Sequence, residues 1–133
     1  MNRVFADTHY FLALLNTGDT AHQRAITASL SLKGELVTTA WVITELADAM
    51  SSSTNRAEFI STYDDLRASK LVRIVEPDSV VFEKGIQLFR KRHDKDWSLT
   101  DCISFIVMEH EGITEALTGD RHFDQAGFIA LLK

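Results

Sequence analysis

The chain has 133 residues, of which 45% are hydrophobic and 25% are charged, so it can bury a core without disulfides and has the composition of a soluble globular protein. Its net charge of −5 disfavours a protein that coats nucleic acid through a basic surface, although it does not exclude an enzyme that binds phosphates through metal ions. The longest apolar run, Tyr10 to Leu15, is too short to cross a bilayer, so we expect no membrane association.

Short apolar runs alternate with longer stretches of helical periodicity along the whole chain. In the first half, the pattern predicts a strand at Arg3–Ala6, helices at Thr8–Asn16 and Ala21–Leu32, a strand at Glu35–Thr38, and helices at Trp41–Met50 and Arg56–Ser69. In the second half, it predicts a strand at Leu71–Val75, a helix opened by Pro77 and ending near His93, a helix at Cys102–Met108 capped by Ser98, and strands at Glu115–Leu117 and Phe128–Leu132.

Strands that are separated by helices imply right-handed crossovers between parallel strands. We therefore expect an α/β protein, a three-layer α/β/α sandwich around a mainly parallel sheet of four to five strands. The chain has one proline, six glycines and no repeat or linker, so residues 1–133 are expected to form one domain.

Two features of the sequence bear on its cellular compartment. The N-terminal segment reaches Asp7 too early for the apolar region of a secretory signal. The single cysteine, Cys102, cannot form an internal disulfide and fits a reducing environment. The expected location is the cytoplasm.

Acidic residues follow two of the predicted strands. Asp7 comes directly after the first strand, and Asp120 lies three residues after the strand that ends at Leu117. Ligands of open parallel sheets bind at the carboxyl ends of the strands, near the point where the strand order reverses. Both side chains are therefore expected at the same edge of the sheet, where a ligand site should form.

Two further acids are expected above that edge. Glu45 lies in the middle of a helix and shares its face with Trp41, Val42 and Ala49, so its carboxylate rises from an apolar stripe. Such a carboxylate is seldom buried without a partner. Asp101 opens the most hydrophobic helix of the chain, where a negative charge is favoured by the helix dipole.

Each of these acids also has a simpler explanation. Asp7 could cap the first helix, and Asp101 could be the third residue of a capping box that Ser98 begins. Glu45 could reach solvent at the edge of its helix, and Asp120 could be a turn residue after a glycine. These alternatives treat each position separately, and they do not explain why four acids fall where the fold should bind its ligand.

A cluster of four carboxylates would repel itself unless cations or protons neutralised it. Two carboxylates about 5 Å apart repel by about 3 kcal/mol at an effective dielectric constant of about 20. All-oxygen sites suit Mg²⁺ or Mn²⁺, and no group of histidines and cysteines has the spacing of a zinc site. Metal ions held in this way can polarise a phosphate and activate water, so the expected reaction is phosphodiester hydrolysis.

Several motifs of the sequence resemble those of one known family. The matching segments are Val4–Thr8, Thr38–Leu46, Trp97–Cys102 and Ala116–Phe123, and the last two contain Ser-Leu-Thr-Asp and Thr-x-Asp-x-His-Phe. Along essentially its whole length the chain resembles PIN domains, and specifically VapC-type toxins of toxin–antitoxin pairs.

The resemblance implies an activity, a site and partners. Asp7, Glu45, Asp101 and Asp120 correspond to the family's metal-binding acids, with Thr118 as a hydroxyl that helps to position a water or a ligand. Asp124 falls where some members have an additional acid. The implied function is cleavage of single-stranded or looped RNA with Mg²⁺ or Mn²⁺ by a homodimer, which a cognate antitoxin inhibits by covering the active site.

Other polar and aromatic groups have two readings each. The basic cluster Arg90–His93, with Lys95, could contact an RNA backbone, but a solvated helix end is the favoured interpretation. Arg121 and His122 could touch a phosphate or simply lie in a loop. Trp41 and Trp97 are expected to pack in or beside the core rather than to stack on bases.

Two rival functions remain to be weighed. The first is a PIN fold without catalysis that binds RNA or protein, which the presence of all four acids disfavours. The second is a receiver domain or an aspartyl phosphatase. A receiver would need a lysine in the tract Leu117–Asp120, and a phosphatase would need an acid where the chain has His9. Both variants are therefore disfavoured.

Overall fold

The structure is a computed structural model that describes residues 2–133. The strands are β1 (Arg3–Ala6), β2 (Glu35–Thr39), β3 (Val72–Val75), β4 (Glu115–Leu117) and β5 (Ile129–Ala130). The helices are α1 (Thr8–Leu15), α2 (His22–Ser31), α3 (Ala40–Ala49), α4 (Arg56–Ala68), α5 (Ser79–Lys91), α6 (Leu99–Glu111) and α7 (Arg121–Gln125). Within residues 2–133, every helix is too short or too polar to cross a membrane.

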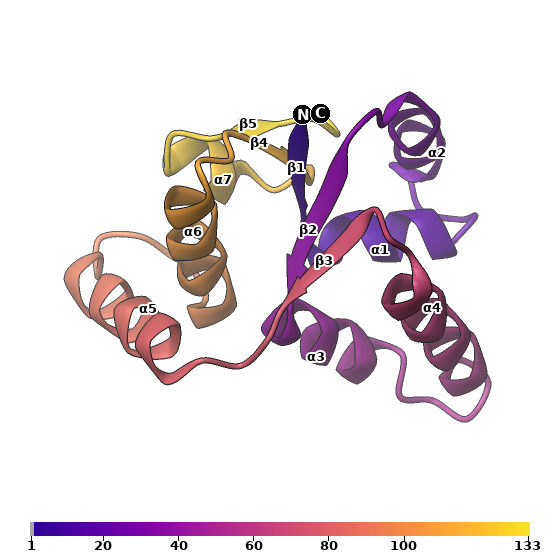
Figure 1. Cartoon of the computed structure of the whole chain (residues 1–133), viewed down its shortest axis with the longest axis horizontal. Helices are drawn as coiled ribbons and strands as arrows, with labels where there is room; N and C mark the ends of the chain where they lie inside the picture. Colours follow the sequence, from indigo (N-terminus) through magenta and orange to yellow (C-terminus); the bar gives the residue numbers. More distant parts are fainter. Residues whose placement is uncertain (1) are drawn as a thin grey trace.

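The five strands form one parallel sheet in the order β3-β2-β1-β4-β5. The helices cover both sides of this sheet, with α5, α6 and α7 on one side and α1, α2 and α4 on the other (Figure 1). The predicted α/β/α sandwich is confirmed. Because β1 pairs with β2 on one side and β4 on the other, the strand order reverses at β1, which is where a ligand site is expected.

The core is formed by the sheet together with buried residues of α6 and α7 and of α1, α2 and α3. Phe5 of β1 and Phe123 of α7 are fully buried, and their ring centroids are 6.3 Å apart. Phe105 of α6 contacts Phe123 edge to face at 5.0 Å. Since α6 buries residues on several sides, as its nearly unbroken apolar sequence predicts, it provides a rigid support for the residues at its N-terminus.

Two helices differ most from the predictions in their bounds, and a third helix was not predicted. Pro77 does not open α5, because the carboxylate of Asp78 accepts hydrogen bonds from the backbone of Val80 and Val81 and caps the helix, which begins at Ser79. Helix α6 extends beyond the predicted apolar run, from the Ser98 cap to Gly112, whose φ of 68° ends it. Helix α7 was not predicted, since five residues are too few to show a periodicity.

Replacing Gly85 with alanine is expected to lower the free energy of unfolding by about 2 kcal/mol. A Cβ atom at this position of α5 would lie 2.4 Å from Cγ1 of Ile103, which is buried in α6. The clash outweighs the gain of about 1 kcal/mol in helix propensity. Urea denaturation measures the effect, with Gly18→Ala as the control, because a Cβ there meets only the Asn16 side chain. Equal stability of the wild type and Gly85→Ala would show that the two helices separate easily.

Candidate active site

Two of the acidic residues are placed by neighbouring strand ends. Asp7 follows β1 and Asp120 follows β4 after a two-residue connection. The two strands are paired in parallel, with Ala6 opposite Leu117. The backbone N–H of Asp7 continues this pairing, donating to the carbonyl of Leu117 at 3.3 Å. The edge predicted from the strand order therefore does hold both residues.

All four predicted acids line one open cleft at this edge, with a volume of about 440 Å³. The residues that line it are Asp7, Thr8, His9, Leu12, Glu45, Ala49, Asp96, Ser98, Asp101, Asp120 and His122. Among residues 2–133, this lining includes five carboxylates and no lysine or arginine. A phosphate group would therefore meet repulsion here unless cations were bound with it.

The carboxylate of Asp7 accepts a hydrogen bond from a buried threonine. The Thr118 hydroxyl donates to Oδ2 of Asp7 at 3.0 Å and accepts from the backbone N–H of Asp120 at the same distance. Thr118 is fully buried and does not line the cleft, and its hydroxyl orients the carboxylate of Asp7. Asp7 itself is 5% exposed and makes no capping hydrogen bond to α1, so the helix-cap alternative is wrong for this residue.

The surroundings of Asp7 favour its protonated form when no metal is bound. Burial, together with the negative charges of Asp101 and Glu45, raises the pKa of Asp7 from 3.8 to about 7, and the hydrogen bond from Thr118 opposes this only in part. The ionised form of Asp7 therefore carries an energetic penalty in the metal-free cleft. A bound cation would remove this penalty, so the donor set fits a metal.

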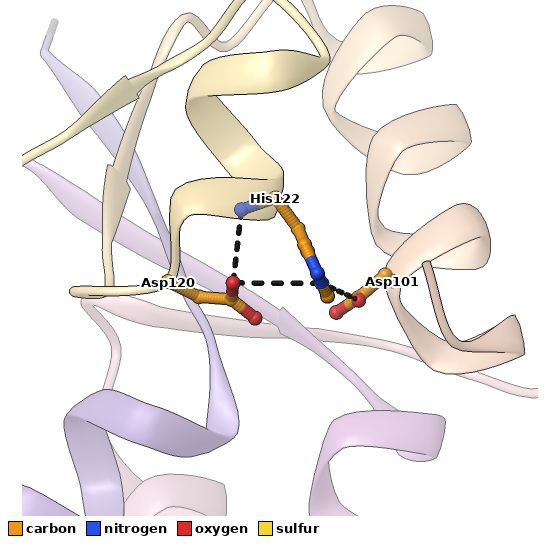
Figure 2. A group of neighbouring side chains, drawn as sticks. All are labelled: Asp101, Asp120 and His122. Atoms are coloured by element: carbon orange, nitrogen blue, oxygen red, sulfur yellow. Dashed lines mark hydrogen bonds and ion pairs between the residues drawn. The ribbon is translucent and has the colours of Figure 1, made fainter. Parts of the chain in front are cut away.

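Asp101, Asp120 and His122 form the tightest group in the cleft (Figure 2). The ring of His122 lies between the two carboxylates, with Nδ1 at 2.9 Å from Oδ2 of Asp101 and 3.5 Å from Oδ1 of Asp120. The three residues offer ligand atoms that all lie within 4.8 Å of one another, so this group could hold a metal ion. A protonated imidazole at this position would itself balance part of the negative charge.

Two of these acids also cap helices, as the simpler explanation of Asp101 expected. Ser98 and Asp101 form the predicted capping box of α6, with bonds of 3.0 and 3.2 Å, and Asp120 caps α7 by accepting from the N–H of His122 at 2.9 Å. A carboxylate has several acceptor sites, so a cap and a ligand role are compatible. The caps fix the orientation of both carboxylates before any ligand arrives.

His122 also changes the expected chemistry of the site. No group of histidines and cysteines in the sequence has the spacing of a zinc site, yet the structure brings one imidazole into the acidic group. A set of carboxylates with one imidazole still suits Mn²⁺, and the carboxylates alone suit Mg²⁺.

Glu45 reaches the cleft from α3. Its carboxylate is half-buried and accepts a hydrogen bond from the Thr8 hydroxyl. The predicted apolar stripe is only partly present, because Val42 is buried whereas Ala49 is exposed. Glu45 therefore lies at the edge of the buried face, where it reaches the cleft.

Thr8 and His9 line the cleft although they were not predicted to belong to it. His9 accepts a hydrogen bond at Nδ1 from the backbone N–H of Gly119, at 3.1 Å. Both residues belong to the first turn of α1, directly after Asp7, so their position in the chain alone could have placed them at this edge.

The remaining candidates lie outside the cleft. Asp124 of α7 forms an ion pair with Lys133, and Arg121 is exposed. Trp97 is 5% exposed, which confirms the expected packing role, and the guanidinium of Arg92 lies 4.8 Å from its ring centroid. Arg92 also forms an ion pair with Asp94, in agreement with a solvated helix end.

Substituting Thr118 by valine is expected to weaken Mn²⁺ binding about tenfold and to destabilise the protein by about 2 kcal/mol. The change keeps the shape of the side chain but leaves Asp7 without the hydrogen bond that orients it. Thr38→Val is the matched control, because Thr38 is equally buried and bonds only the carbonyl of Ala6. Calorimetric titration and denaturation measure the two effects; loss of metal affinity in both variants would argue against a specific role for Thr118.

Comparisons with known proteins agree with this geometry. The sequence matches the PIN domain family over residues 4–129. It is 26% identical over 126 residues to the 23S rRNA-specific endonuclease VapC20 of Mycobacterium tuberculosis, covering 95% of both proteins. The crystal structure of VapC20, a sarcin–ricin loop cleaving toxin, covers 95% of this chain and 96% of its own with a TM-score of 0.87.

A second solved structure supports the fold alone. FitAcB from Neisseria gonorrhoeae is 19% identical, with a TM-score of 0.70 over 96% of this chain and 95% of that one. The family match spans all four predicted acids and nearly the whole sheet. The chain belongs to the PIN domain family.

Proposed function

We propose that this protein is a metal-dependent endoribonuclease, the toxin of a VapBC-type toxin–antitoxin pair, which hydrolyses phosphodiester bonds in RNA. The observation that carries the proposal is the cleft, where Asp7, Glu45, Asp101 and Asp120 come from separate elements to one place that no lysine or arginine lines among the described residues. Membership of the PIN family and likeness to a ribosomal RNA endonuclease support the same function.

Asp7, Asp101, Asp120 and Glu45 would hold the metal, which we propose to be Mg²⁺ or Mn²⁺. When bound, such an ion polarises a phosphate oxygen and lowers the pKa of an attacking water. The protein prepares the carboxylates for this role. Thr118 orients Asp7, while the cap of α6 orients Asp101, so the acids need little rearrangement on binding.

His122 has a distinct part in the proposal. Its imidazole contacts both Asp101 and Asp120, so it can hold these two carboxylates in place. We therefore assign it a positioning role.

The shape of the cleft is also relevant, because an open site admits a strand of RNA from the side, as an endonuclease requires.

Ribosomal RNA is the substrate that we propose to test first, because the relative VapC20 is named for its specificity for 23S rRNA. The proposal includes a cognate antitoxin, a homodimer, a cytoplasmic location and one nuclease domain over residues 1–133. The buried, unpaired Cys102 is compatible with a reducing compartment.

A catalytically silent PIN module that binds RNA or protein is the alternative. Such a module would have no need for a carboxylate like that of Asp7, whose pKa is raised to about 7 by burial and then by the charges of Asp101 and Glu45. The cost of this cluster therefore favours the enzyme.

The experiment that tests the proposal is cleavage of ribosomal RNA by the purified chain with Mg²⁺, with Mn²⁺, and with EDTA. We expect discrete cleavage products with either ion and none in the chelator. Cleavage that persists in EDTA would contradict the metal mechanism, and intact RNA under all conditions would favour the silent module.

A further inference from the structure

His9 differs from the other histidine of the cleft. Among the described residues, its ring forms no hydrogen bond or ion pair with a carboxylate. The other histidine of the cleft, His122, lies between Asp101 and Asp120. His9 instead accepts a backbone N–H, that of Gly119, at Nδ1. The two rings are therefore prepared for different tasks.

The backbone around His9 is fitted to this ring. A Cβ atom on Gly119 would lie 2.8 Å from Cε1 of His9 and 3.4 Å from the carbonyl oxygen of Leu132. Only a glycine lets the loop after β4 approach the imidazole so closely. The position of the His9 ring thus depends on its contact with the backbone of Gly119, which lies 110 positions away in the chain.

The hydrogen bond from Gly119 fixes the tautomer of the neutral ring. Because Nδ1 uses its lone pair to accept the N–H, the proton of the neutral imidazole is on Nε2. A ring in this state has no free lone pair for a metal ion, but it offers an N–H donor. Within the described part of the chain, Nε2 of His9 has no hydrogen-bond partner.

The cleft has few donors for a polyanion. Its five carboxylates only accept, and the Thr8 hydroxyl already donates to Glu45. A bound RNA strand would nevertheless place several phosphates along this surface. A metal held by the acids would bind only the phosphate at the cleaved bond, so the flanking phosphates need other donors. A neutral N–H donor in the cleft that does not compete for the metal meets this need.

We propose that His9 is a substrate-binding residue whose Nε2–H donates a hydrogen bond to a non-bridging oxygen of an RNA phosphate that flanks the cleaved one. This inference rests on the proposed ribonuclease function and adds to it a contact outside the acidic group. In this proposal His9 binds the RNA, whereas His122 positions the carboxylates of Asp101 and Asp120.

The test compares His9→Phe, which keeps a ring without donors, with His9→Gln, whose amide can accept from Gly119 and donate in turn. The substrate is a short RNA that spans the bond cut by the wild type, assayed with Mn²⁺. We expect His9→Phe to raise KM roughly tenfold and to lower kcat by less than about threefold, whereas His9→Gln restores most of the affinity. His110→Phe, the same change at an exposed histidine outside the cleft, is the control.

Two further measurements separate substrate contact from a structural effect. Calorimetry should give the same Mn²⁺ affinity for His9→Phe as for the wild type. An RNA with a neutral methylphosphonate at the flanking phosphate should bind the wild type roughly tenfold more weakly, but His9→Phe no more weakly than the unmodified RNA.

An unchanged KM in His9→Phe, or a loss of Mn²⁺ affinity in that variant, would overturn the assignment of His9 while leaving the nuclease proposal intact. An equal methylphosphonate penalty in both proteins would also overturn it. Failure of the wild type to cut any RNA with Mn²⁺ would overturn the nuclease proposal itself.

Discussion

Substitution of Asp101 by asparagine is expected to reduce metal-dependent RNA cleavage on the order of a thousandfold, because the change removes several kcal/mol of charge interaction with the metal and each 1.4 kcal/mol corresponds to tenfold in rate. Asparagine keeps the size of the side chain and an oxygen for the capping bond with Ser98. The loss should therefore come from charge and not from unfolding. Initial rates of cleavage at saturating Mn²⁺ measure it.

The control for this variant is Asp64→Asn, which removes one charge from an exposed position of α4 outside the cleft. Both variants should show cooperative thermal unfolding. If Asp101→Asn retained more than about a tenth of the wild-type rate, the acidic group would not be the catalytic centre and the proposed mechanism would have to be abandoned.

Substitution of Asp7 by asparagine is expected to stabilise the metal-free protein at pH 8, by up to about 4 kcal/mol. The pKa of Asp7 in the folded state is raised from 3.8 to about 7, mainly by burial and then by the charges of Asp101 and Glu45. Between these two values the folded state binds more protons than the unfolded state. The free energy of unfolding of the wild type therefore falls as the pH rises from about 4 to about 7, and the penalty persists above that range.

Thermal unfolding in EDTA at pH 5 and pH 8 measures the effect. Asp7→Asn should melt roughly 10 °C above the wild type at pH 8, and the difference should shrink at pH 5, where Asp7 is mostly protonated. Asp64→Asn should leave the melting temperature nearly unchanged at both values. A variant less stable than the wild type in EDTA at pH 8 would show that Asp7 carries no electrostatic penalty.

Addition of Mn²⁺ provides the complementary half of this prediction. The ion should stabilise the wild type by binding only its folded state, and it should stabilise Asp7→Asn much less. The difference in melting temperature between Asp7→Asn and the wild type at pH 8 would then become smaller or change sign. A residue that destabilises the free protein and is needed for ligand binding is typical of a functional site rather than of the core.

Most of the fold could be predicted because strongly patterned segments determine their own structure. The run Arg3–Ala6 forms a strand where expected, and the predicted strand Leu71–Val75 is present from Val72. The alternation of strands and helices was enough to give a parallel sheet, since right-handed crossovers leave few other arrangements. The short helix α7 was missed because it is stabilised by the Asp120 cap and the burial of Phe123, and neither produces a periodic pattern.

The sequence predicted where the acids of the candidate site lie, but not which side chains contact one another there. Strand ends give the edge at which Asp7 and Asp120 emerge, and the topology of the sheet follows from the order of the elements. The contact of His122 with Asp101 joins two helices, and the bond from Gly119 to His9 joins a loop to α1. Side-chain pairings of this kind depend on packing across the molecule, so no local pattern reports them.

By itself, the amino-acid sequence determined the α/β topology and the four carboxylates that gather at one edge, because strand and helix periodicity act locally and parallel strands share their carboxyl ends. Only the tertiary structure decided which groups are buried there and what they contact. Thr118 lies 111 positions from Asp7 in the chain, yet their hydrogen bond and the burial around it set the orientation and the protonation of that carboxylate. Desolvation and distance are properties of the packed molecule, so they could be obtained only from its three-dimensional arrangement.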